Sequence, residues 1–202
     1  MAEAFRQRTI KNIQMITHDN FRLLEDYAAG PLLLLGSQTM NILGMQGRHA
    51  ANELNCDDLD INGQAKINFD LSKFKAKTEF GPYNTIADFG TLEHVGNEGR
   101  TANAIRNVFE WLVPNGTAIH VNPSPSYVDP YSHKDCIRFT TDFWKAYATE
   151  SGMDLIHSDY LPAYALAETA IETRAVLKKV KNSKPVAKKT IVELIKTHCQ
   201  YV

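Results

Sequence analysis

The stretch YNTIADFGTLEHVGNEG, from Tyr83 to Gly99, contains a short apolar strand that leads directly into polar residues. Residues 84–88 are the run expected of a buried strand, and Gly90 follows where the chain has to turn. Glu93 and His94 come just behind that turn. An acid–histidine pair directly after a buried strand predicts polar side chains at the carboxyl edge of a sheet, where ligands of parallel sheets bind.

The chain has 202 residues, which suits one domain with at most a small appendage. Its hydrophobic fraction of 44% is enough for a full core, and its formal net charge of -1 lacks the electrostatic footprint of a nucleic-acid binder. We therefore predict no nucleic-acid partner. The three cysteines are scattered without a CxxC pair, which favours a reducing compartment over a disulfide framework or a zinc site. No apolar run has the length of a signal segment or a membrane span, so we expect a cytoplasmic protein without a membrane partner.

Helical and strand patterns alternate along the chain. Strands are expected at residues 32–35, 58–61, 84–88, 117–121, 154–158 and 173–179, with a brief further segment at 67–71. Helices are expected within 3–28, loosely within 41–55, and at 101–112, 140–152 and 190–198, with a turn at 114–116. This alternation predicts an α/β sandwich with a mainly parallel sheet, whose ligand lies at the carboxyl ends of the strands.

An ordered set of segments resembles the class I S-adenosylmethionine-dependent methyltransferases. The segments are PLLLLGSQ (31–38), DDLDING (57–63), INFDLS (67–72), YNTIADFGTLEHV (83–95), FEWLVPNGTAIHV (109–121), RFTTDFWKAYATESGMDLI (138–156) and ETRAVLKKV (172–180). The resemblance implies a three-layer, Rossmann-like sandwich with a mostly parallel seven-stranded sheet. It also implies S-adenosylmethionine as cofactor and methyl transfer to a small-molecule acceptor, which we expect to occur on oxygen. The corresponding division of the chain is a helical cap over 1–30, a methyltransferase-like domain over 31–182, and a basic linker with a helix over 183–202.

The resemblance also implies roles for the residues at the strand ends. Asp60, with Asp58 as second choice, would accept hydrogen bonds from the ribose hydroxyls, and Asp70 would accept one from the adenine amino group. Gly36 would let the backbone approach the ligand closely. The predicted cofactor-binding residues are Gly36, Ser37, Gln38, Asp60, Ile61, Asp70, Leu71, Asp88 and Gly90. The alternative is that Asp58 and Asp60 are ordinary solvated acids at the end of a strand, with no role in binding.

The loop after the first strand departs from the family pattern. Leu35 stands where the family has an acid, and Gly36 is the last glycine before Gly44. The missing glycines weaken the dinucleotide-type fingerprint and motivate a second hypothesis. In that hypothesis the chain is a catalytically inactive methyltransferase-like protein with a binding or regulatory role. A nicotinamide-dependent enzyme is the third alternative, and the absent G-x-G-x-x-G motif argues against it.

Three interpretations of Glu93-His94 stay open. His94 would act as a general base or orient the substrate, since its pKa normally lies near neutrality. In the second interpretation, the pair ligates a metal together with His120 or His133. That arrangement resembles the E-x-x-E-H motif of small-RNA 2′-O-methyltransferases, but Gly90 stands where the first acid belongs, so we predict no metal. In the third, the pair is structural.

The segment HVNPSPSYVDPYSHKDCIRF, from His120 to Phe139, is a long proline- and serine-rich loop after a strand. Long loops in compact domains are often functional, although an ordinary solvated connection is the alternative. Methyl transfer needs an acceptor held in line and stripped of its proton. We therefore predict His94, His133 and Tyr131 as the catalytic set. A homo-oligomer is left open.

Overall fold

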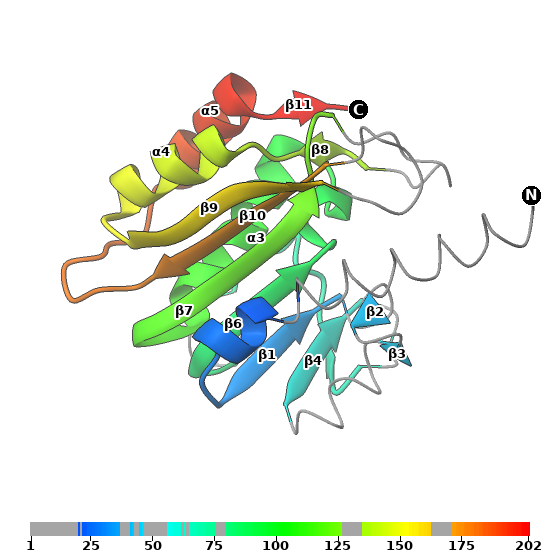
Figure 1. The fold of residues 1–202 in the computed structure, drawn as a ribbon, viewed down its shortest axis with the longest axis vertical. Helices are drawn as coiled ribbons and strands as arrows, with labels where there is room; N and C mark the ends of the chain where they lie inside the picture. Colours follow the sequence, from blue (N-terminus) through cyan, green and yellow to red (C-terminus); the bar gives the residue numbers. More distant parts are fainter. Residues whose placement is uncertain are drawn as a thin grey trace, which may run out of the picture.

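The computed structural model describes residues 20, 22–36, 41–42, 45–46, 56–61, 63, 65–75, 80–126, 135–162 and 171–202. Their centre is a seven-stranded sheet with the order β5-β4-β1-β6-β7-β10-β9 (Figure 1). The strands are β1 (Leu32–Leu35), β4 (Asp57–Asp60), β5 (Ile67–Asn68), β6 (Tyr83–Phe89), β7 (Leu112–Pro123), β9 (Asp154–Pro162) and β10 (Ile171–Lys178). β10 runs antiparallel to both β7 and β9, and the other neighbours are parallel. The mostly parallel sheet confirms the predicted fold class.

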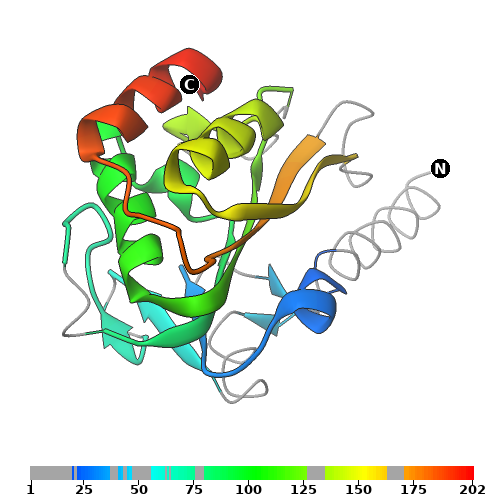
Figure 2. The ribbon, with the colours of Figure 1, turned by 90° about the vertical axis from the view of Figure 1, so that its left-hand side faces the viewer.

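The sheet is covered on both faces. The helices α3 (Glu98–Trp111), α4 (Thr141–Ser151) and α5 (Lys188–His198) lie on one face, and helical residues 22–27 lie on the other (Figure 2). Leu33 and Leu35 pack into the cluster on the three-helix face, whereas Leu34 packs with Leu23 on the opposite face. Both faces of β1 are therefore apolar, which explains its unbroken run of leucines.

Capping residues fix where the helices begin and end. Asn97 accepts a hydrogen bond from the Arg100 backbone at the start of α3, three residues earlier than the sequence pattern predicted. Thr140 caps α4 by accepting from the Phe143 backbone, and Gly152 ends that helix in the left-handed conformation. These α4 boundaries confirm the predicted ones. Within the described residues, no helix has both the length and the apolar content needed to cross a membrane.

Two predicted segments fold differently. The described part of 41–55 forms a hairpin of β2 (Asn41–Ile42) and β3 (Met45–Gln46), so the helix expected there was wrong at these residues. Short apolar runs do not separate helix from strand by periodicity alone. The turn expected at 114–116 lies inside β7, which begins as soon as α3 ends. Asn115 adopts a positive φ of 68°, and its N–H donates to the Lys179 carbonyl, so the turn is absorbed as a bulge.

The C-terminal part of the described chain joins the core. Ile191 and Ile195 of α5 are fully buried in the cluster shared with α3 and α4. After α5, the strand β11 (Gln200–Tyr201) pairs antiparallel with β8 (Ile137–Arg138). This pairing ties the end of the described chain to the segment that follows the long loop, on the side of the sheet where the predicted site lies.

Lys179 closes the carboxyl end of α3. Its Nζ donates to the carbonyls of Phe109 at 2.7 Å and Leu112 at 2.9 Å, and it lies 4.1 Å from the centre of the Phe109 ring. A cation at this position gives a hydrogen-bond donor to carbonyls that have no partner within the helix, and its charge complements the helix dipole. Lys179 therefore has a structural role, whereas the side chain of its neighbour Lys178 is exposed.

We expect Lys179→Met to lower the free energy of unfolding by about 1–3 kcal/mol, because two carbonyls lose a charged donor. Lys178→Met is the matched control and should change it by less than about 0.5 kcal/mol. Urea unfolding followed by circular dichroism measures both. Equal effects of the two substitutions would contradict the capping role.

Candidate cofactor and acceptor site

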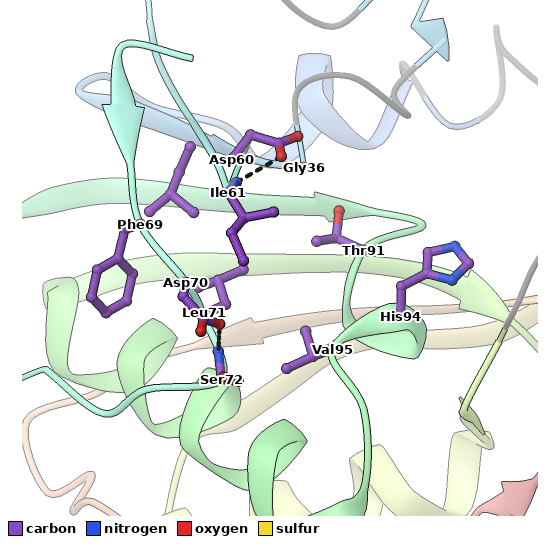
Figure 3. Close-up of a pocket in the computed structure, with 11 residues that line it drawn as sticks. Gly36, Asp60, Ile61, Phe69, Asp70, Leu71, Ser72, Thr91, His94 and Val95 are labelled. Atoms are coloured by element: carbon purple, nitrogen blue, oxygen red, sulfur yellow. Dashed lines mark hydrogen bonds between the residues drawn. The ribbon is translucent and has the colours of Figure 1, made fainter. Parts of the chain in front are cut away.

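A cavity of about 220 Å³ opens at the carboxyl ends of β1, β4 and β6. It is lined by Gly36, Leu59, Asp60, Ile61, Phe69, Asp70, Leu71, Ser72, Thr91, His94 and Val95. Asp60, Ile61 and Asp70 lie on one side, and Thr91 and His94 lie on the other (Figure 3). The cavity is thus placed where parallel α/β sheets bind their ligands.

Two carboxylates face the cavity from the β4 and β5 side. Asp60 ends β4, and its Oδ1 accepts from the Ile61 backbone at 2.7 Å. Asp70 follows β5, and its Oδ1 accepts from the Ser72 backbone at 3.0 Å. The hydrogen bond from the Ser72 side chain is the main cause that lowers the pKa of Asp70, so this group is ionised at neutral pH. Both carboxylates can accept hydrogen bonds from hydroxyl or amino groups.

Asp58, the second choice for the ribose acceptor, does not reach this cavity. It is fully buried within β4, and its Oδ1 accepts from the Lys66 backbone at 2.9 Å. Because side chains alternate along a strand, Asp58 and Asp60 would be expected on the same face. They have different surroundings because Asp58 lies within β4, whereas Asp60 is its last residue, where the chain leaves the sheet.

Gly36 lies against the side chain of Thr91. A Cβ on Gly36 would lie 2.1 Å from Thr91 Oγ1, and its φ of 68° is in the left-handed region. Thr91 Oγ1 donates to the Leu35 carbonyl at 3.0 Å, and the Gly36 N–H donates to the Leu59 carbonyl at 2.8 Å. Glycine is therefore required at this position by Thr91 and by the backbone conformation, before any ligand is considered.

We expect Gly36→Ala to destabilise the protein by about 1–2 kcal/mol for the left-handed conformation. Crowding against Thr91 should add about 1–3 kcal/mol. Gly30→Ala is the matched control, since a Cβ there would meet nothing within 4 Å. Thermal unfolding of the two variants measures the difference. If both variants unfolded at the same temperature, the assigned contact would be wrong.

Asp88 is a fully buried carboxylate at the end of β6. Its Oδ1 accepts from the backbone N–H groups of Thr91 at 3.0 Å and Leu92 at 3.3 Å. Its Oδ2 accepts from Asn122 Nδ2 at 2.9 Å and lies 3.2 Å from His120 Nδ1. This carboxylate therefore holds the turn that leads from β6 into the 3₁₀ helix η1 (Leu92–His94).

Glu93 is a second buried carboxyl group beside Asp88. Asn122 Nδ2 bridges the two acids, because it also donates to Glu93 Oε2 at 3.1 Å. Burial is the main cause that raises the pKa of Glu93 well above its ordinary value, and the nearby charges of Asp88 and Asp135 add to the shift. We conclude that Glu93 resists ionisation in the folded protein.

We expect Glu93→Gln to become progressively more stable than the natural protein as pH rises. In the natural protein, the raised pKa of Glu93 stabilises the folded state only at low pH, where the carboxyl group is protonated. This stabilisation is lost as pH rises from the ordinary pKa of 4.5 to the raised one, and the glutamine variant does not lose it. Over that window the difference in unfolding free energy should change by up to about 1.4 kcal/mol per pH unit. Urea unfolding at a series of pH values measures it. A difference that does not vary with pH would refute a neutral Glu93.

His94 lies between two acids at the cavity wall. Its Nε2 is 3.7 Å from Glu93 Oε1, and its Nδ1 is 3.6 Å from Asp135 Oδ1. Ligand atoms of these three residues lie within 4.8 Å of one another, which a metal ion could bridge. Arg138 already pairs with Asp135, however, at 3.2 Å through both Nε and Nη2. A resident cation thus balances the charge of that carboxylate.

His120 is not part of this group. It stacks on Trp144 with ring centres 4.2 Å apart, and it faces Asp88. The metal set of Glu93, His94 and His120 considered from the sequence is therefore not assembled. His133, the other histidine considered, lies outside the described residues.

The structure brings several predicted residues together. Those that line the cavity are Gly36, Asp60, Ile61, Asp70, Leu71 and His94. The predicted Asp88 and Gly90 are not among the residues that line it: Asp88 is buried and binds the backbone of the lining residue Thr91, and Gly90 turns the chain between them with a φ of 79°. The predicted Ser37, Gln38, Tyr131 and His133 lie outside the described residues.

Three contributors were missed from the sequence. Thr91 and Asn122 gave no signal, because a threonine after a turn and an asparagine at a strand end are common. Asp135 lies at the end of the long loop in which Tyr131 and His133 were the predicted residues. Its spacing of three residues from Arg138 is the local signal that could have indicated it.

Neither a protein-family model nor a curated protein matches the sequence. Solved structures do match. The N-methyltransferase NodS from Bradyrhizobium japonicum WM9 superposes with a TM-score of 0.60 at 12% identity, covering 85% of this chain and 98% of NodS. A Haemonchus contortus phosphoethanolamine N-methyltransferase, solved with phosphoethanolamine and S-adenosylhomocysteine, gives 0.62 at 12% identity over 88% of this chain and 46% of its own.

A third match is the Burkholderia thailandensis 1,6-didemethyltoxoflavin-N1-methyltransferase, with bound 1,6-didemethyltoxoflavin and S-adenosylhomocysteine. Its TM-score is 0.55 at 11% identity, over 87% of this chain and 83% of the other. Together with the strand order, these likenesses establish that the chain has the fold of the class I S-adenosylmethionine-dependent methyltransferases. At such low identities they establish the fold alone.

Proposed function

We propose that this protein transfers a methyl group from S-adenosylmethionine to a small-molecule acceptor, most simply onto an oxygen atom. The observation that carries the proposal is the cavity at the strand ends, which has two carboxylates on one side and a histidine on the other. It occurs in a sheet with the strand order of methyltransferases, and two of the three solved structures described above contain S-adenosylhomocysteine.

The residues present fit a nucleoside cofactor. Asp60 would accept hydrogen bonds from the ribose hydroxyls, and Asp70, whose lowered pKa keeps it ionised, would accept from the adenine amino group. Ile61 offers an exposed apolar side chain at the cavity, with 66% of its surface accessible, and Leu71 offers another apolar surface. Apolar walls with a few placed acceptors are typical of small-molecule sites.

The acceptor end would be formed by His94. The cofactor supplies an electrophilic methyl group when it is bound. A hydroxyl acceptor must lose its proton as the new O–C bond forms, and a histidine in hydrogen-bonding reach can take that proton. A neutral amine already has a free lone pair and needs no such base, so the presence of His94 favours oxygen. Tyr131 and His133 remain predicted partners in this role.

Calorimetric titration with S-adenosylhomocysteine tests the cofactor half of the proposal. Asp60→Ala should weaken binding by about 10–100-fold, because hydrogen bonds to a charged acceptor contribute about 1.5–3 kcal/mol. Asp142→Ala is the matched control, since Asp142 is exposed on α4 and pairs only with Lys145 among its described contacts.

Absence of binding to the natural protein would instead support the inactive, methyltransferase-like alternative that the glycine-poor loop suggested. Unchanged affinity in Asp60→Ala would reject the ribose assignment while leaving the fold intact. The acceptor atom is tested separately, by identifying the methylated product with mass spectrometry after incubation with a panel of hydroxyl and amine compounds. Methylated amines alone would overturn the oxygen assignment.

A further inference from the structure

One stripe of α3 carries the side chains of Asn103, Asn107 and Trp111, which stand four residues apart in the sequence. Residues at this spacing lie above one another on the same side of a helix. Each of the three donates a side-chain hydrogen bond to the backbone of residues 71–75, the segment that directly follows Asp70. We call these three side chains the α3 stripe. A segment without helix or strand is thus bound to a helix at four of its five carbonyl groups.

Asn107 is the centre of the α3 stripe and uses both ends of its amide. Its Nδ2 donates to the carbonyls of Lys73 at 2.7 Å and Leu71 at 3.3 Å, and its Oδ1 accepts from the Lys75 N–H at 2.9 Å. The side chain is fully buried. These bonds fix the conformation of the segment, because breaking one of them would leave a buried polar group without its partner.

Asn103 binds the part of the segment that lies at the cavity. Its Nδ2 donates to the Ser72 carbonyl at 2.8 Å, and its side chain is half-buried. Ser72 lines the cavity, and its N–H donates to Asp70 Oδ1 at 3.0 Å (Figure 3). The Lys73 N–H donates to the Asp70 carbonyl at 3.0 Å and closes the same turn. Asn103 therefore holds the residue whose backbone binds the cavity carboxylate.

The direction of the Asp70 carboxylate decides which chemical group it can bind. An ionised carboxylate accepts hydrogen bonds and donates none, so it favours an amino group over a carbonyl oxygen. This preference requires a carboxylate that is held in place, because one that can turn away from an unsuitable group does not reject it. The ion pair with Lys73 holds it weakly, since Nζ lies 3.9 Å from Oδ2 and the Lys73 side chain is 75% exposed. The turn closed by the Ser72 N–H supplies the constraint.

We propose that Asn103, supported by Asn107 and Trp111, is a positioning residue for Asp70 and thereby sets the selectivity of the cavity for a base that carries an amino group. This inference rests on the proposed function, in which Asp70 accepts from the adenine amino group. None of the three side chains of the α3 stripe lines the cavity. They act through the backbone of residues 71–75, which they hold in the turn that directs the carboxylate.

Calorimetric titration with two cofactor analogues tests the selectivity. S-adenosylhomocysteine carries the amino group, and S-inosylhomocysteine carries a carbonyl oxygen in its place. The natural protein should bind the first about 10–100-fold more tightly, which is the contribution of one hydrogen bond to a charged acceptor. Asn103→Ala should reduce this ratio by about 2–10-fold, because the segment loses one neutral hydrogen bond. Asn103→Gln retains the amide donor and should keep more of the ratio than Asn103→Ala.

Asp70→Asn separates the role of the carboxylate from that of the α3 stripe. The new amide can keep its oxygen toward the Ser72 N–H and present its NH₂ group to the ligand. This variant should therefore bind S-inosylhomocysteine at least as tightly as S-adenosylhomocysteine. Asp142→Ala, on the exposed side of α4, is the control and should keep the natural ratio. An unchanged ratio in Asn103→Ala, or equal binding of both compounds to the natural protein, would overturn the inference and leave the proposed function intact.

Hydrogen exchange of the protein without ligand measures the positioning by itself. The Ser72 and Lys73 amides, which close the turn, should exchange about 2–10-fold faster in Asn103→Ala. The Thr91 amide lies on the opposite side of the cavity, so its rate should not change. Unchanged rates at Ser72 and Lys73 would overturn the positioning role. A natural protein that bound neither compound would overturn the proposed function together with the selectivity, which distinguishes that failure from equal binding of both.

Discussion

The buried carboxylate of Asp88 is the constraint on which the site depends. It stands at the end of β6, where the chain must leave the sheet, and it accepts the backbone N–H groups of Thr91 and Leu92. Those two bonds hold the turn at which η1 begins. Thr91 then reaches back to β1 through the Leu35 carbonyl, while His94 is delivered to the cavity wall. A buried carboxylate is stable only when its oxygens have hydrogen-bond donors, and the two oxygens of Asp88 join the turn after β6 to His120 and Asn122 of β7.

Asp88 and Glu93 are close together but behave differently because their donors differ. Asp88 faces two backbone N–H groups, the Asn122 amide and His120, whereas the side-chain donor to Glu93 is the shared Asn122 amide. Burial disfavours the charged form of Glu93, and the nearby Asp88 charge adds to this effect. Both raise the pKa of Glu93, and the hydrogen bond from Asn122 opposes them. Asn122 bridges both acids, so one amide connects the two carboxyl groups.

Much of the sheet could be predicted from the sequence, since apolar runs such as Leu32–Leu35 are local signals of buried strands. The order of segments also predicted the fold class, and the chain turn after β6 pointed to Glu93 and His94. What could not be predicted depended on contacts between distant segments. Asp135 meets His94 across 41 positions of sequence only because β8 is held against η1 and β11. The bulge at Asn115 likewise exists because Lys179, which follows β10, supplies its hydrogen-bond partner. Neither contact could be recognised from the local sequence around one of its two residues.

The glycine-poor loop after β1 has a different meaning once the contact with Thr91 is seen. Glycines in such loops normally permit tight turns and close approach of the backbone. Here Gly36 takes the left-handed conformation, and the space beside it is occupied by the Thr91 side chain rather than left open. The turn is held by bonds from Thr91 to Leu35 and from Gly36 to Leu59. A single glycine therefore satisfies the geometry at the end of β1, and the count of glycines in the loop does not by itself argue against a bound cofactor. The carboxylates of Asp60 and Asp70, which the cavity retains, are the stronger indication of what it binds.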